Sequence, residues 1–173
     1  MVKQTSSKDP LLAVTVPRGR RAAALMDYVI YERGLELGAV SPDPKPADAK
    51  ALYTLIVQAM TSDTGHKNLR PVIPPELTLP VDTQALAHVM RTTALHFKTE
   101  QPLAVTLTVS GGRVRIQCKS PAPKAIEEGE SLRAKLEKSI AILGAELDLD
   151  PLTPSSMSIL LPLPKRTRAA RKR

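Results

Sequence analysis

Two alternating runs on either side of Gly111-Gly112 restrict the fold more than any other part of the sequence. Residues 103–109 (LAVTLTV) and 113–118 (RVRIQC) place apolar and polar side chains in turn, which is the pattern of a half-buried β-strand. Two glycines between such runs are typical of a tight turn, because its central residues need positive φ angles. The segment therefore predicts a β-hairpin with one face packed against a core.

Apolar residues recur at helical spacing before and after this hairpin. Asp82 or Thr83 can cap a helix that runs to about residue 98, and Ser131 can cap a second helix that ends near Leu143. Two further strands are predicted at 146–148 and 156–163. The order helix, hairpin, loop, helix, hairpin predicts an α+β fold, a two-layer sandwich in which a mostly antiparallel sheet carries helices on one face.

The sixteen prolines of the chain favour short elements, and several of them divide its N-terminal half. We predict a strand at 11–16, a helix over 20–36, a proline-broken linker at 41–46, a second helix over 47–61 and an extended connector at 70–80. The predicted parts are a flexible N-terminus (1–10), an N-terminal strand and helical hairpin (11–70), an α+β domain (71–164) and a basic, disordered tail (165–173).

Composition excludes several classes of function. Aromatic residues make up only 2% of the chain, which argues against stacking on the bases of single-stranded nucleic acid. The single cysteine, Cys118, excludes an internal disulfide, and no Cys/His cluster has the spacing of a metal site. No apolar run approaches the ~20 residues of a membrane span, and the first residues lack the pattern of a signal peptide. We expect a cytoplasmic protein that uses no membrane, metal or cofactor.

The net charge of +8 is concentrated in the last nine residues. Six cations in so short a segment repel one another and cannot be buried together, so we expect it to be disordered and to associate with nucleic acid through the phosphates. The predicted nucleic-acid-binding residues are Lys165, Arg166, Arg168, Arg171, Lys172 and Arg173, with a smaller patch at Arg18, Arg20 and Arg21. The alternative is a solubilising tail without a dedicated partner.

The C-terminal half also carries a longer order of motifs. The segment VDTQALAHVMRTTALHF (81–97) has an aspartate before a helix that ends in Thr-Ala-x-His-Phe, and the hairpin after it runs into KSPAPKAI (119–126). A helix that ends in LGAELDLD follows, and then SMSILLPLP. This order resembles the ATP-binding domain of histidine kinases and their GHKL relatives over residues 81–164, which implies the fold of that domain.

The residues that would bind nucleotide in that family are replaced in this chain. The resemblance places the magnesium-holding asparagine at Thr93 and the adenine-reading aspartate at Ser120. It places two glycines of the nucleotide loop at Ala122 and Lys124, and it leaves only Gly129 in the phosphate-cradling lid. A threonine hydroxyl is a poor Mg²⁺ ligand, and side chains at glycine positions crowd the purine. The resemblance thus implies a degenerate domain that is not an enzyme.

The histidines and the cysteine are assigned no functional role. His66 (GHKNLRP) lies too close to Asp82 for a phosphoacceptor on a separate helical hairpin, so we interpret it as an exposed loop histidine. His88 and His96 lie two turns apart on one helix without a third ligand, and we expect them at the surface. Cys118 has no positioned base, so we expect a small buried residue.

Together these patterns predict a non-catalytic regulatory protein of a bacterium, a plasmid or a phage. Its α+β body would make protein contacts or form a homodimer, and its basic tail would bind nucleic acid. Two alternatives stay open. One is a protein-binding adaptor, or pseudo-histidine kinase, in a signalling pathway, and the other is an ATP-binding protein with an atypical pocket.

Overall fold

The computed structural model describes residues 41–62, 64–121, 129–149 and 155–164, together with Ile30, Arg33, Gly34, Leu37 and Ala39. It divides into two units, Met1–Val40 and Ser41–Arg173. In the first unit, Ile30, Arg33 and Gly34 are helical, in agreement with the helix predicted over 20–36. The N-terminus at 1–10, the strand predicted at 11–16 and the tail at 165–173 lie outside the described residues.

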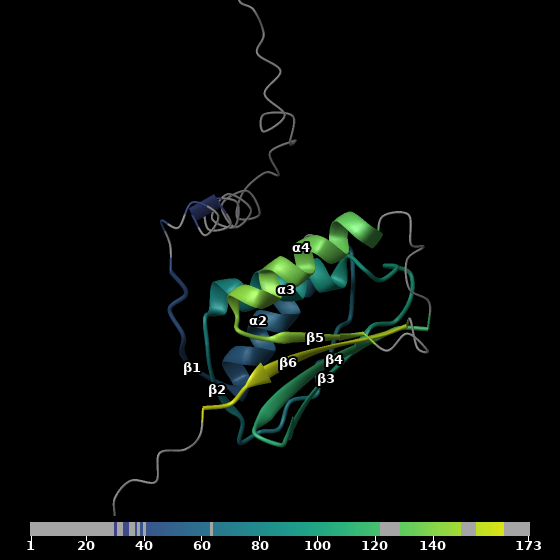
Figure 1. Ribbon diagram of the computed structural model, residues 1–173. Helices are drawn as coiled ribbons and strands as arrows, with labels where there is room; N and C mark the ends of the chain where they lie inside the picture. Colours follow the sequence, from purple (N-terminus) through teal and green to yellow (C-terminus); the bar gives the residue numbers. More distant parts are fainter. Residues whose placement is uncertain are drawn as a thin grey trace, which may run out of the picture. The chain divides into compact units, whose positions relative to one another are not determined.

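A four-stranded antiparallel sheet forms one layer of the second unit (Figure 1). Its strands lie side by side in the order β3 (Ala104–Ser110), β4 (Arg113–Lys119), β6 (Ser156–Pro162) and β5 (Glu146–Leu149). The predicted hairpin is β3–β4, and its turn residues Gly111 and Gly112 have φ angles of 58° and 73°. The second predicted hairpin is β5–β6, and β6 also pairs with β4, so it joins the two hairpins into one sheet.

Three described helices cover one face of this sheet: α2 (Ala49–Thr61), α3 (Thr83–Ala94) and α4 (Gly129–Ile142) (Figure 1). Along β4, Val114, Ile116 and Cys118 are buried while the residues between them are exposed, so only one face of the sheet meets the helices. The predicted two-layer α+β fold is confirmed. In the described part of the chain, no helix combines the length and the apolar character that a membrane crossing requires.

One continuous core joins the helices to the sheet. Each fully buried aliphatic side chain stabilises the fold by about 1.5–3 kcal/mol relative to exposure, so this cluster dominates the folding energy. Aliphatic residues make up most of it, as the low aromatic content predicts, and Phe97 is its one buried aromatic residue among those described. The largest fully buried aliphatic side chains are Leu52, Ile56, Met60, Leu79, Leu86, Met90, Leu107, Ile116, Leu136, Ile140 and Ile159.

The N-terminal part of this unit differs from the sequence-based expectation. Part of the predicted linker forms β1 (Lys45–Asp48), which pairs antiparallel with β2 (Thr78–Val81) and places Pro46 opposite Pro80. Proline has no N–H to donate, so it is tolerated where a strand edge needs no such bond, as in a two-stranded sheet. This pairing joins residues on both sides of 70, and the division predicted at 70/71 is replaced by one at Val40/Ser41.

A smaller difference concerns the start of α4. The helix begins at Gly129, so Ser131 lies inside its first turn instead of preceding it as a cap. The end of the helix agrees with the prediction, because Gly144 follows it at a φ angle of 62° and the Gly144 N–H donates to the Ala141 carbonyl at 3.0 Å. A glycine with positive φ just beyond the last turn is a common helix ending.

Candidate functional site

Asp82 fixes the helix on which the candidate site depends. Its Oδ1 accepts the backbone N–H groups of Gln84 and Ala85 at 3.0 and 2.9 Å, which caps the first turn of α3 as predicted. Its Oδ2 accepts the N–H of Asp43 at 2.7 Å, from the segment that leads into β1. The carboxylate therefore ties the start of α3 to the two-stranded sheet as well as to its own helix.

Thr93 is the next-to-last residue of α3 and faces the core. Its side chain is fully buried, and its Oγ1 donates to the Val89 carbonyl at 2.7 Å, within the same helix. A threonine hydroxyl has a single proton, which this bond uses. The resemblance aligns Thr93 with an asparagine whose side chain holds magnesium. In this chain the Thr93 hydroxyl instead bonds to the backbone of its own helix.

Ser120 directly follows β4, at the edge of the sheet where the polypeptide enters the predicted nucleotide loop. Its backbone N–H donates to the Ser155 carbonyl at 2.9 Å, which holds it beside the start of β6. Its Oγ is buried and has no hydrogen-bond partner among the described residues. The following positions of interest, Ala122 and Lys124, lie outside the described residues.

The predicted nucleic-acid-binding residues also lie outside the described residues, so their predicted role stays a prediction. They are Arg18, Arg20, Arg21, Lys165, Arg166, Arg168, Arg171, Lys172 and Arg173.

The structure corrects the placement of two histidines. His66 is only 4% exposed, and its Nε2 lies 2.9 Å from the Ala94 carbonyl oxygen at the end of α3. The last carbonyls of a helix lack intrahelical donors, and a histidine from another loop can supply one. His88, expected at the surface, is also buried. His96 is partly buried.

Cys118 is buried on β4, as predicted, and burial raises the pKa of its thiol to about 12. A thiol with that pKa carries almost no thiolate near neutral pH, so it is not a nucleophile in the folded chain. Among the described residues, no three His, Cys, Asp or Glu side chains are grouped so that they could hold a metal ion.

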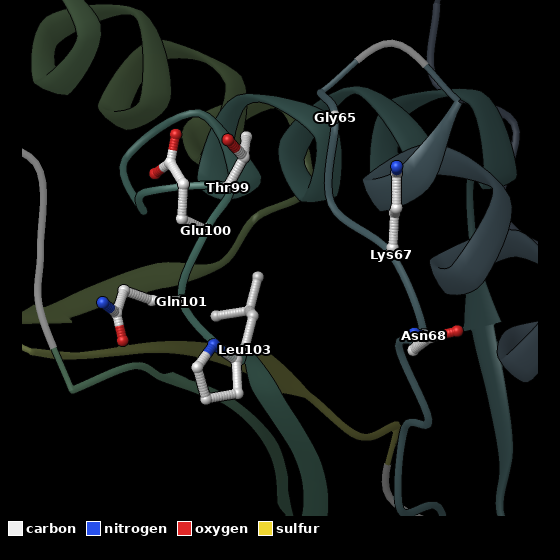
Figure 2. Close-up of a pocket in the computed structure, with 8 residues that line it drawn as sticks. Gly65, Lys67, Asn68, Thr99, Glu100, Gln101 and Leu103 are labelled. Atoms are coloured by element: carbon white, nitrogen blue, oxygen red, sulfur yellow. The ribbon is translucent and has the colours of Figure 1, made fainter.

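A solvent-open cleft of about 580 Å³ is lined by neither Thr93 nor Ser120, and sequence reasoning did not find it. Figure 2 shows its two walls, one formed by residues 65–68 after α2 and the other by residues 99–103 after α3. The signals in the sequence were Gly65 and the polar run Thr99 to Gln101 after a helix, which on their own indicate only loops.

Comparisons with known proteins agree on the fold. No protein-family model matches the sequence, and no curated protein matches it. Among solved structures, the chain is similar to the histidine kinase AdeS of Acinetobacter baumannii, with a TM-score of 0.61 and 12% identity over 83% of this chain and 79% of that one. The histidine kinase domain of the E. coli osmosensor EnvZ gives a TM-score of 0.54 and 13% identity over 78% and 98% of the two chains.

The ATP-binding domain of PrrB from Mycobacterium tuberculosis gives a TM-score of 0.51 and 16% identity over 71% of this chain and 99% of that one. The helices and strands that suggested the resemblance are present in the structure in the predicted order along the chain. The chain has the fold of a histidine-kinase-type, or GHKL, ATP-binding domain.

Proposed function

We propose that this chain is a non-catalytic regulatory protein that uses a histidine-kinase-type ATP-binding fold as a scaffold, and that its basic segment at 165–173 associates with nucleic acid. The observation that carries the non-catalytic part is the environment of Thr93. Its side chain is fully buried and its hydroxyl bonds to the Val89 carbonyl. A magnesium ligand must present an oxygen lone pair to an open site, and the fully buried Thr93 side chain has no exposed surface from which to do so.

Ser120 supports the same proposal. An aspartate at this position would offer a charged acceptor to the amino group of adenine, whereas a neutral hydroxyl makes a hydrogen bond of about half the strength. The Ser120 Oγ is also buried. The sequence adds Ala122 and Lys124 where the resemblance places glycines.

Isothermal titration of the full-length chain with ATP and Mg²⁺ tests the non-catalytic part. We expect no binding at micromolar nucleotide, because neither Thr93 nor Ser120 supplies the expected ligand. Micromolar affinity would contradict the proposal, and its loss in Thr93→Val but not in Thr93→Ser would identify the Thr93 hydroxyl as a ligand. That result would favour an ATP-binding protein with an atypical pocket.

The nucleic-acid part of the proposal rests on charge. Six cations that all contact phosphates would give a slope of about −5 in a plot of log affinity against log salt concentration for duplex DNA. A gel-shift series at low and moderate salt should compare the full-length chain with one that ends at Pro164. A variant with Lys50, Arg70 and Lys98 changed to Gln is the control for charge lost elsewhere, because all three residues are exposed and none is predicted to bind nucleic acid. Unchanged affinity after the truncation would show that the nucleic-acid part is wrong.

The second candidate function is a protein-binding adaptor, and exposed apolar side chains beside β3 favour it. Val72 forms a parallel bridge with Thr106 of that strand and is 64% exposed, while Val109 is 50% exposed. Exposed apolar residues along the edge of a sheet are typical of a surface that receives another chain, including a second copy. Under this function the tail is incidental, so truncation at Pro164 leaves partner binding unchanged and Val109→Asp weakens it.

A further inference from the structure

The cleft between residues 65–68 and residues 99–103 has the lining of a small-molecule site. Its volume of about 580 Å³ falls within the range of ~300–1,000 Å³ that is typical of ligand pockets. Figure 2 shows Lys67 and Asn68 along one wall, with Thr99, Glu100 and Gln101 along the other. Pro102 and Leu103 complete the lining.

Both walls are held by buried contacts, so the cleft does not depend on loose loops. The first wall is anchored by His66, whose Nε2 lies 2.9 Å from the Ala94 carbonyl oxygen, and by the buried Leu69. The second wall leaves the core at the buried Phe97. The walls meet at Gly65, where a Cβ would lie 3.1 Å from the Thr99 Cγ2. A site between anchored walls needs little ordering when it binds a ligand.

The polar groups of the cleft include one cation and one anion on opposite walls. Lys67 comes from the first wall and Glu100 from the second, and neither forms an ion pair within the described part of the chain. Two primary amides, on Asn68 and Gln101, and the Thr99 hydroxyl can each donate and accept hydrogen bonds. The cleft thus offers charges of opposite sign on its two walls, together with neutral polar groups on the same walls.

This lining excludes several classes of ligand. The apolar side chains of the lining are Pro102 and Leu103, so a nucleobase finds no aromatic ring to stack on and a lipid chain finds too little apolar surface. A polyanion would meet Glu100 opposite Lys67. A ligand that carries one carboxylate and one ammonium group matches both charges, and peptide amides can hydrogen-bond to the neutral polar groups of the two walls.

We propose that this cleft binds a small zwitterion, either a free amino acid or a short peptide with free termini. Its carboxylate contacts the Lys67 ammonium, and its ammonium contacts the Glu100 carboxylate. Neither Thr93 nor Ser120 lines this cleft, and the proposal does not rest on the proposed regulatory function.

The test uses amide chemical shifts of the ¹⁵N-labelled full-length chain during titration with glycine and with triglycine to about 20 mM, since open sites with exposed charges bind weakly. Triglycine amide lacks the carboxylate, and N-acetyl-triglycine lacks the ammonium. We expect saturable shifts at residues 65–68 and 99–101. Each capped peptide should bind about threefold more weakly than triglycine, which is the usual size of one exposed ion pair.

Two variants assign the charges. In Lys67→Gln, triglycine and triglycine amide should bind equally, and in Glu100→Gln, triglycine and N-acetyl-triglycine should do so. Lys50→Gln and Glu76→Gln are the matched controls, because both residues are exposed and outside the cleft. Tighter binding of glycine assigns a free amino acid, and tighter binding of triglycine assigns a peptide.

Three results would overturn the proposal. The first is the absence of saturable shifts at the two walls with both zwitterions. The second is unchanged affinity in Lys67→Gln and Glu100→Gln. The third is binding of N-acetyl-triglycine as tight as that of triglycine, which would identify an anion site.

Discussion

Replacement of Asp82 by alanine should destabilise the fold far more than the same change at the other aspartate cap, Asp48. Asp82 is buried and accepts three backbone N–H groups, from Gln84, Ala85 and Asp43. Asp48 is exposed and accepts one, from Ala51 at the start of α2. Both residues are aspartates that cap a helix. The difference between the two losses of stability therefore reports the effect of burial and of the number of hydrogen bonds.

The expected magnitudes follow from these contacts. Loss of an exposed cap costs about 0.5–1 kcal/mol, which is our expectation for Asp48→Ala. At Asp82 the cap is lost together with a charge-assisted bond to the Asp43 N–H, and such bonds contribute about 1.5–3 kcal/mol. We therefore expect Asp82→Ala to lower the free energy of unfolding by about 2–4 kcal/mol. In a chain of this size that corresponds to a fall in Tm of about 4–16 °C.

Urea unfolding followed by far-UV circular dichroism measures both variants, since the chain has no tryptophan for fluorescence. Asp82→Asn separates the two contributions. Its amide oxygen can still cap α3, but its NH₂ group cannot accept the Asp43 N–H, so the cost should fall between those of the two alanine variants. Equal costs for Asp82→Ala and Asp48→Ala would refute the assignment of Asp82 as a link between α3 and the two-stranded sheet.

Three further predictions concern single contacts. Burial raises the pKa of the Cys118 thiol from its ordinary value of 9.0 to about 12 in the folded chain. The unfolded chain therefore loses this proton first, and the free energy of unfolding should fall by up to about 1.4 kcal/mol per pH unit from pH 9 to 12. Urea unfolding of Cys118→Ala over the same pH range should lack this slope. Gly65→Ala should lower Tm more than Gly144→Ala, because both have positive φ but only at Gly65 does a Cβ meet a neighbour, at 3.1 Å. The Arg115 guanidinium and the Asp148 carboxylate are 3.0 Å apart, and both side chains are about half exposed. A double-mutant cycle on this pair should give a coupling energy of about 0.2–1 kcal/mol that decreases in high salt. A larger coupling energy that does not depend on salt would contradict the assignment of a screened surface ion pair.

The sequence predicts the fold well where local and long-range preferences agree. Gly111-Gly112 and the alternating runs beside it identify β3–β4, and Asp82 identifies the start of α3, because each signal lies within the element it defines. β1 is missed because Pro46 indicates a linker in any local window. Its pairing opposite Pro80 depends on a strand more than thirty residues away.

The candidate site is less accessible to sequence reasoning. Thr93 and Ser120 are located by the motif order alone, but the bond from Thr93 to the Val89 carbonyl and the burial of the Ser120 Oγ appear only in the structure. His66 illustrates the limit most clearly. A histidine in a polar loop is usually exposed, and its burial here depends on the Ala94 carbonyl, 28 positions along the chain.

The position of β6 affects how the sheet assembles during synthesis. β6 pairs with both β4 and β5, yet it is the last of the four strands to leave the ribosome. Until it emerges, the β3–β4 hairpin has an open edge, and the core face of Val114, Ile116 and Cys118 lacks its neighbours from β6. Open apolar edges attract other nascent chains. Slow translation between residues 120 and 156 would therefore favour aggregation, and a chaperone that shields β4 during that interval would raise the yield of folded protein.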